Sequence, residues 1–168
     1  MYPYHEECTA TVAADPDAVF RYLDDQTRLS AHMNERSWKL GWGKMQVRLD
    51  ERGGRAVGSH IILEGRVFGV HLYLEEVVTE RTPPIHKRWR TIGEPYLLVV
   101  GRYVMGFDVS AVGSGAALRV VIDYERPTRG LSRLLGRLFG RVYARWCTRR
   151  MVRDAEATFA GQAKPTMR

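Results

Sequence analysis

The chain has 168 residues, of which 45% are hydrophobic and 27% charged, enough for one ordinary domain with a substantial core. This composition excludes a disordered chain, and the longest run without Asp, Glu, Lys or Arg (109–118) is about half a transmembrane helix. No basic region followed by an apolar one marks a secretory signal, and two cysteines without a CxxC motif argue against a disulfide framework or zinc. We expect one cytoplasmic domain over 1–168, with its core at about 5–160, a tail at 161–168, and no cofactor or metal.

The net charge of +7 is concentrated in one segment. Between Arg129 and Arg153 the chain has eight arginines, no lysine and no acidic residue. Outside this segment, 18 basic residues stand against 19 acidic ones, a balance of −1. A general polyanion-binding surface is therefore disfavoured, and the function of this local basic segment has to be explained separately.

The N-terminal third is expected to contain one strand and two short helices. Alternating β-branched residues predict a strand at 6–13. Asp15 is a suitable N-cap and Pro16 suits the first helical position, so a helix is expected over Pro16–Asp24. A second short helix is expected at about 26–33. After the glycine-rich hinge at 41–43 the hydrophobic period becomes two, which indicates strands.

Six strands joined by short turns then favour antiparallel hairpins, and a long helix ends the chain. The expected strands are near Met45–Leu49 and at about 58–64, 67–79, 85–92, 96–109 and 116–125, with turns or breaks at Gly53-Gly54, Gly65, Pro83-Pro84, Gly93-Glu94-Pro95 and Gly113-Ser114-Gly115, and the helix at about 131–159.

A curved sheet with a single long helix buries its concave face against that helix. The period of two then predicts which strand residues point inward. They are mostly apolar, with tyrosine hydroxyls as the chief polar groups, which is typical of a small-molecule pocket and equally of a plain core. The predicted inward residues are Met45, Val47, Leu49, Phe68, Val70, Leu72, Leu74, Trp89, Leu97, Val99, Tyr103, Met105, Phe107, Leu118, Val120, Ile122 and Tyr124.

Several segments resemble one superfamily. They are TATVAADPDAVFRYLDDQTRLSAHM (9–33), VGSHIILEG (57–65), VVTERTPPIHKRW (77–89), GRYVMGFDV (101–109) and ALRVVIDYERP (117–127). In them the chain resembles the START-related helix-grip superfamily (SRPBCC), which includes polyketide cyclases, plant allergens and lipid-transfer proteins. The resemblance implies an α+β helix-grip fold: a curved seven-stranded antiparallel sheet wrapped around a long C-terminal helix, with two short helices after the first strand. It implies no universal catalytic motif, because function in such a fold resides in the cavity.

No chemical motif stands out among the titratable residues. His60 and His71 fall on neighbouring strands without metal-ligand spacing, and His71 is expected to point outward. For both, a half-exposed strand histidine is the favoured reading, and a catalytic or ligand-polarising role is the alternative. Arginines near Cys147 would lower the pKa of its thiol, although packing as a small hydrophobe is the favoured reading. The Glu75-Glu76 pair straddles both faces of one strand. Asp108 and Asp123 are expected to face outward, where solvent or a partner satisfies them.

The C-terminal helix has two apolar faces. Arginines recur every fourth residue, which advances about 40° beyond a full turn each time and makes a spiral. The apolar residues of its first half lie on a different face from those of its second half. Either the helix kinks at Gly136 or Gly140, or its first half directs its apolar face away from the cup. The plain alternative is a helix packed on the sheet with solvated or paired arginines.

Three functions follow as hypotheses. The first is non-catalytic binding of a lipid-like or polycyclic small molecule between sheet and helix. The second is a polyketide cyclase or dehydratase using the same cavity, with Tyr103, Tyr124 and His60 as acid–base groups. The third is a peripheral membrane or protein-interaction module that uses the helix at 129–153. Nucleic acid is not an expected partner. The predicted ligand-binding residues are Leu72, Trp89, Tyr103, Met105, Ile122, Tyr124 and His60, and the predicted membrane or partner contacts are Leu131, Leu135, Leu138, Arg133, Arg137 and Arg141.

Overall fold

The computed structural model describes residues 2–28, 45–67 and 69–161, without the side chains of Met45 and Val67. Seven strands form one antiparallel sheet in the order β1-β7-β6-β5-β4-β3-β2. The elements are β1 (Tyr4–Val12), α1 (Pro16–Asp24), β2 (Met45–Leu49), β3 (His60–Val67), β4 (Val70–Thr82), β5 (His86–Tyr96), β6 (Tyr103–Val112), β7 (Gly115–Tyr124) and α3 (Gly130–Ala160).

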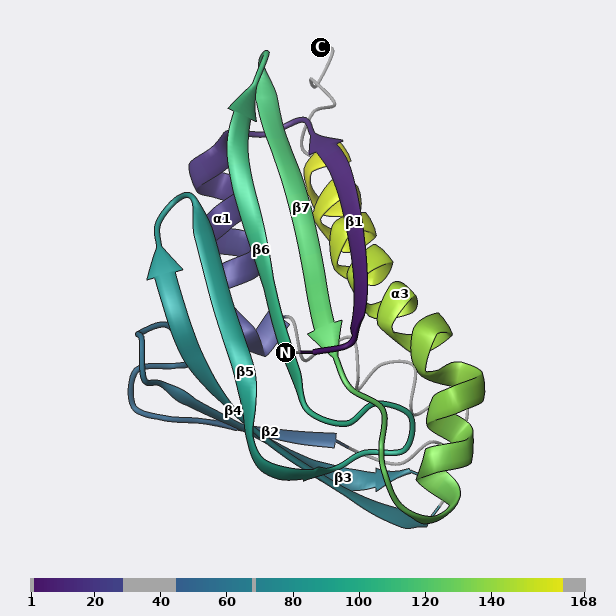
Figure 1. Ribbon diagram of the computed structural model, residues 1–168. Coiled ribbons are helices and arrows are strands. Elements are labelled where there is room, and N and C mark those ends of the chain that lie inside the picture. The colour runs from purple at the N-terminus through teal and green to yellow at the C-terminus, as the bar shows by residue number, and fades with distance from the viewer. Residues whose placement is uncertain (1, 29–44, 68, 162–168) are drawn as a thin grey trace.

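The sheet curves around its helices (Figure 1). The helices α1 and α3 lie on the same face of the sheet, and β1, β7 and β6 run alongside them, whereas β2 and β3 cross the lower end. Among the described elements, α3 packs chiefly on β1 and β7, and α1 packs on β6 and β7. The predicted α+β helix-grip fold is confirmed.

The alternation of period two orients most strand residues as predicted. The buried members of the predicted inward set are Leu74, Trp89, Tyr103, Met105, Phe107, Leu118, Val120, Ile122 and Tyr124. The half-buried members are Val47, Leu49, Leu72, Leu97 and Val99. Val70 was predicted wrongly: it is 44% exposed because it lies at the end of the β3–β4 hairpin. Phe68 and the side chain of Met45 lie outside the described residues.

Two predicted strand breaks were wrong. Gly65 lies inside β3, where it pairs with Met45 and Leu72, and the turn instead follows at Gly69, whose φ of 78° suits glycine. Gly93 and Pro95 lie within β5, which continues to Tyr96. The next strand, β6, starts only at Tyr103, because the chain before it forms an irregular loop. Gly101 in that loop donates to the Glu125 carbonyl at 2.7 Å.

The helix α1 has the predicted start. The Asp15 side chain accepts a hydrogen bond from the Asp17 amide at 2.8 Å, and Pro16 occupies the first turn. Its inner face buries Val19, Phe20 and Leu23. A further helical segment starts at 26–28, and the rest of the predicted second helix and the 41–43 hinge lie outside the described residues.

The first half of α3 directs its large apolar side chains outward, as one of the two predicted alternatives requires. The helix α3 is continuous from Gly130 to Ala160, and Gly136 and Gly140 are buried within it. A Cβ atom on Gly136 would lie 2.6 Å from Cδ of Pro127, and one on Gly140 would lie 2.9 Å from the Val99 carbonyl oxygen. These glycines therefore permit close approach of the helix to the loop before β6. Within the described residues, no helix has the length and apolar character needed to cross a bilayer.

Candidate functional site

A carboxyl group is buried on the concave face of the sheet. Glu76 of β4 is only 4% exposed and shares its face with Leu74 and Val78. In register, Glu76 pairs with Thr91 of β5, whose hydroxyl accepts a hydrogen bond from the Tyr103 amide at 3.0 Å. The Thr91 hydroxyl thus links β5 to β6 at the point where these two strands separate. Glu76, Thr91 and Tyr103 therefore lie in one row across β4, β5 and β6.

Two neutral groups donate hydrogen bonds to this carboxyl. The phenol of Tyr103 donates to Oε1 of Glu76, and the indole N–H of Trp89 donates to the same carboxylate. Burial raises the pKa of Glu76 to about 7, and the two hydrogen bonds and the charge of Lys87 only partly oppose the shift. A carboxyl group with this pKa exchanges its proton near neutral pH, as a general acid or base requires.

The helix α3 contributes two further groups to this cluster. Tyr143 and Cys147 are half-buried, pack against the core and share a hydrogen bond. Burial raises the pKa of the Cys147 thiol to about 12, so the arginines beside it in sequence do not activate it. The expectation that Cys147 packs as a small hydrophobe is confirmed. We call Glu76, Trp89, Tyr103, Tyr143 and Cys147 the Glu76 cluster.

A second buried carboxylate has a different environment. Asp24, at the end of α1, is 4% exposed and accepts a hydrogen bond from Nζ of Lys87 at 2.9 Å. The Arg81 guanidinium binds the same carboxylate with two nitrogens, at 2.8 and 3.2 Å. Although burial pushes the pKa of Asp24 upward, the hydrogen bonds from Arg81 and Lys87 hold it below its ordinary value. Lys87 is fully buried and also donates to the Gly54 carbonyl at 2.8 Å, so this cluster joins α1, β4, β5 and the β2–β3 connection.

Six of the seven predicted ligand-binding residues lie on the concave face. Trp89 and Tyr103 belong to the Glu76 cluster, and Tyr124 lies apart beneath Gly140, with its ring 5.4 Å from that of Tyr4. The other three, all apolar, are Leu72, Met105 and Ile122. His60 is the exception: its side chain is half exposed on the outer face and hydrogen-bonds Glu75 at 2.8 Å. This agrees with the favoured reading of a half-exposed strand histidine and separates His60 from the predicted ligand-binding set.

The outer face also holds the other polar groups predicted there. His71 bonds Glu64 at 3.0 Å, Asp108 binds Arg88 at 2.6 Å, and Asp123 binds His5 at 2.7 Å. Their outward orientation is confirmed. Within the described residues, no group of three His, Cys, Asp or Glu side chains is arranged to hold a metal ion.

Glu76 itself was missed, although the sequence contains its signal. Leu74 and Val78 flank it at spacings of two, so Glu76 has inward parity among apolar residues. Lys87 has the same relation to Trp89. A charged residue at a strand position that faces the core is informative, because its burial requires hydrogen-bond or ion-pair partners.

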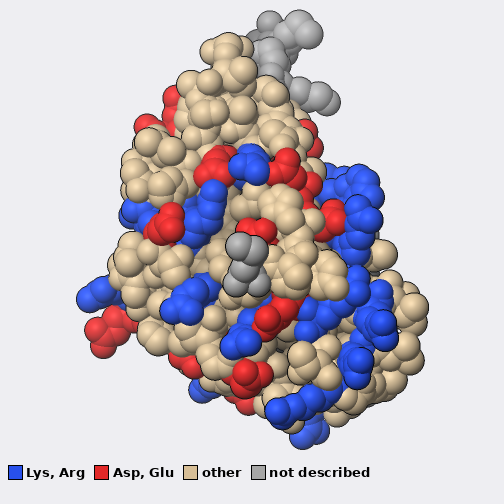
Figure 2. Space-filling model, viewed as in Figure 1, with Lys and Arg blue, Asp and Glu red and all other residues tan. Residues whose placement is uncertain are grey.

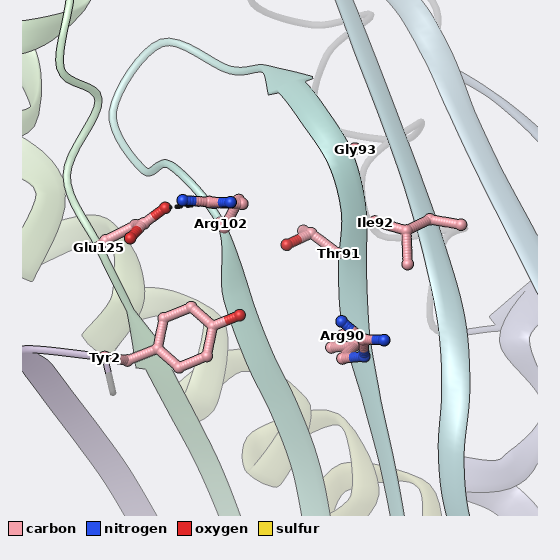
Figure 3. A pocket seen from close by; sticks show the side chains of 7 residues that line it. All are labelled: Tyr2, Arg90, Thr91, Ile92, Gly93, Arg102 and Glu125. Atoms are coloured by element: carbon pink, nitrogen blue, oxygen red, sulfur yellow. Dashed lines mark hydrogen bonds and ion pairs between the residues drawn. The ribbon is translucent and has the colours of Figure 1, made fainter.

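A pocket of about 310 Å³ opens where β5 and β6 separate (Figure 3). Arg90 of β5 and Arg102 line it, and Arg102 is already bound to Glu125 at 2.6 Å. It contains none of the predicted ligand-binding residues and is lined mainly by polar side chains, unlike the apolar cavity expected between sheet and helix. Its lining residues are Tyr2, Arg90, Thr91, Ile92, Gly93, Arg102 and Glu125.

The predicted membrane or partner contacts lie on the first half of α3. Leu131 and Leu138 are strongly exposed, and Leu135 is half-buried. Arg133, Arg137 and Arg141 are exposed, and Arg141 binds Glu6 of β1 at 2.7 Å.

A curved antiparallel sheet that holds a long C-terminal helix defines the helix-grip class. The model of the family described as polyketide cyclase / dehydrase and lipid transport matches residues 7–157, so the chain belongs to that family. The family is associated with hydrophobic small molecules. No curated protein matches the chain.

Solved structures share the fold at low identity. Protein CV1439 from Chromobacterium violaceum has a TM-score of 0.64 and 15% identity, over 94% of this chain and 97% of that one. TTHA0849 from Thermus thermophilus has a TM-score of 0.65 and 14% identity, over 96% and 100%. Norcoclaurine synthase from Thalictrum flavum, in complex with dopamine and hydroxybenzaldehyde, has a TM-score of 0.61 and 16% identity, over 97% and 89%. At such identities these similarities establish the fold alone.

Proposed function

We propose that this protein binds a hydrophobic small molecule, lipid-like or polycyclic, between the concave face and α3, and that the Glu76 cluster orients it. The observation that carries the proposal is a buried carboxyl whose hydrogen-bond donors are the neutral Tyr103 and Trp89. Burying a carboxyl without a direct cationic partner costs stability, and an apolar residue there would avoid the cost. Positions that break a stability rule in this way are expected at functional sites.

The surroundings of the Glu76 cluster suit an apolar ligand with one polar group. Leu74, Val78 and Met105 are apolar neighbours on the same concave face. Burial of ligand surface there would stabilise a complex by about 25 cal/mol per Å². A hydroxyl or carbonyl on the ligand would exchange hydrogen bonds with Glu76 and Tyr103, which sets its orientation. The half-buried Tyr143 and Cys147 bound the cluster on the side of α3.

Ligand binding is tested in two measurements on the full chain. Native mass spectrometry of freshly purified protein should detect a retained small molecule. Titration with 1-anilinonaphthalene-8-sulfonate, followed by displacement with fatty acids, sterols and polycyclic phenols, should show saturable binding of one class. Glu76→Gln and Tyr103→Phe should weaken that class about tenfold, whereas His60→Gln on the outer face should leave binding unchanged. Absence of both retained ligand and saturable displacement would overturn the proposal.

An enzyme of the cyclase or dehydratase type is the second candidate, and the pKa of about 7 at Glu76 favours it. The ionised Glu76 carboxylate would remove a proton from carbon between two carbonyls of a poly-β-ketone. Tyr103 would donate a hydrogen bond to the enolate oxygen that forms. Turnover should then rise with pH through about 7, and Glu76→Gln should abolish it while binding persists. A Glu76→Gln variant with unchanged turnover would exclude this candidate.

A further inference from the structure

The first half of α3 is packed with its small residues inward. Gly136, Gly140 and Ala144 are buried at spacings of four residues. The Val99 carbonyl oxygen lies 3.1 Å from a Cβ built on Gly136 and 2.9 Å from one built on Gly140. Because this approach leaves no room for large side chains, the large apolar residues of this half are turned away from the protein.

These residues form a continuous exposed apolar face. On a helix that advances about 100° per residue, most of them fall within an arc of about 140° opposite the buried glycines. Single exposed apolar residues are common, but a contiguous face of this kind marks an interaction surface. The residues and their exposed fractions are Leu131 (70%), Leu134 (55%), Leu138 (60%), Phe139 (51%), Val142 (65%) and Trp146 (39%); we call them the α3 apolar face.

Arginines approach the α3 apolar face from one side. Arg141 lies at its edge, Arg137 about 40° farther back and the exposed Arg145 within the arc, whereas Arg133 lies on the side of the buried glycines. The helix α3 has no acidic residue before Asp154. Within the described part of the chain, Arg137 and Arg145 form no ion pair. Figure 2 shows basic side chains gathered along the edge where α3 lies, with uncharged surface beside them. Toward the C-terminus the arginine spiral crosses this arc at Arg145 and Arg149, which ends the apolar face near Trp146.

Charge decides between the possible occupants of this surface. A second copy of the chain would bring the same unneutralised arginines against one another, which disfavours self-association. Nucleic acid would pair with arginines but would leave the broad aliphatic face exposed to water. An anionic bilayer satisfies both features, because its hydrocarbon accepts the apolar face and its headgroups attract the flanking arginines.

We propose that the first half of α3 docks in the plane of an anionic lipid bilayer, with the α3 apolar face inserted at the headgroup boundary. The prediction is tested by flotation of the full chain with vesicles of 30% phosphatidylglycerol in phosphatidylcholine, and with phosphatidylcholine alone. Binding should be at least tenfold stronger to the anionic vesicles and should fall by a similar factor between 50 and 500 mM NaCl.

Two double variants separate the apolar and basic contributions. Leu134→Gln with Leu138→Gln, and Arg137→Glu with Arg145→Glu, should each reduce binding about tenfold or more, with unchanged circular dichroism because all four side chains are exposed. Their matched controls are exposed positions outside α3: Ile85→Gln with Val112→Gln, and Arg52→Glu with Arg90→Glu. The controls should bind like the wild type.

Three results would each overturn the proposal. They are no flotation of the wild type with anionic vesicles, equal losses in the α3 variants and their controls, and a wild-type dimer that the leucine variant converts to monomer. The last result would assign the α3 apolar face to a second copy of this chain. Because flotation does not depend on ligand binding by the Glu76 cluster, the two proposals stand or fall separately.

Discussion

Asp24 and Glu76 have the same small exposed fraction, yet their pKa values are shifted in opposite directions. Both residues are 4% exposed. Asp24 contacts two cations, Arg81 and Lys87, and its pKa is lowered. Glu76 accepts from two neutral donors, and its pKa is raised to about 7. Two cations stabilise the charged form of Asp24 against its burial, whereas the deeper burial of the Glu76 carboxyl group outweighs its neutral donors.

The comparison separates a structural site from a candidate functional one. The Asp24 carboxylate, paired with Arg81 and Lys87, ties the end of α1 to β4 and β5 and stays ionised. Glu76 exchanges a proton near neutral pH, beside the tyrosine and tryptophan predicted to contact a ligand. The following predictions test this difference, from the largest expected effect to the smallest.

Removing Lys87, one of the two cations that contact Asp24, should have the largest effect on stability. Lys87→Met leaves a buried carboxylate with Arg81 alone, so the free energy of unfolding should fall by about 3–5 kcal/mol. Urea denaturation at pH 7 measures it. Arg48→Met, which breaks an exposed pair with Glu64 on the same sheet, is the control and should cost much less. Equal costs would mean that Lys87 is not essential to the buried site.

Neutralising Glu76 should stabilise the protein in a pH-dependent way. Its folded pKa of about 7 lies above the ordinary 4.5, so the folded state holds the proton more tightly and wild-type stability falls as pH rises between these values. Glu76→Gln escapes this loss. The free energy of unfolding of this variant minus that of the wild type should be about 2–3 kcal/mol larger at pH 8 than at pH 5. Urea denaturation at the two pH values measures it. Glu51→Gln, at an exposed turn position, should show no such pH dependence.

Removing the Tyr103 hydroxyl should raise the pKa of Glu76 further. The phenol hydrogen bond favours the charged carboxylate, so Tyr103→Phe should shift the titration upward by about one unit, or about 1.4 kcal/mol. Carbon NMR of labelled glutamate side chains follows this titration. Tyr22→Phe removes a hydroxyl that donates to the Asp154 carbonyl outside the Glu76 cluster, and should leave it unchanged. A downward shift would contradict the proposed donation.

Replacing His60 should have the smallest effect. Its side chain is half exposed on the outer face and is paired only with Glu75 among the described residues. His60→Gln should change the free energy of unfolding by less than about 0.5 kcal/mol at pH 7 and leave ligand binding intact. A loss of binding equal to that of Tyr103→Phe would restore the sequence-based role of His60.

Local rules predicted most of the fold. Asp15 and Pro16 marked the start of α1, and the period of two oriented Trp89, Tyr103 and Met105 correctly. On β3 the period of two did not show which set of residues faces inward. In the structure Ile61 and Leu63 are buried, and His60 therefore faces outward. The strand break at Gly65 was wrong, because a glycine in a paired strand and a glycine in a turn look alike without the partner strand.

The candidate site depends on registers that sequence does not specify. Two irregularities in the β4–β5 pairing, between Tyr73 and Glu75 and between Val78 and Glu80, decide which residues face Glu76. A bulge shifts the register beyond it by one residue, so the meeting of Glu76 with Tyr103 could not be derived from spacing. The sequence alone indicated that Glu76 faces inward, but it did not indicate which residues Glu76 contacts.

The amino-acid order by itself determined the elements, the parity of most strands and the concentration of arginine in one helix, because capping, periodicity and charge are properties of neighbours along the chain. Tertiary structure decided which partners surround Asp24 and Glu76, and which side of α3 meets the domain. Those outcomes depend on contacts between distant segments, such as the Val99 carbonyl that admits only glycine at position 140 of the helix.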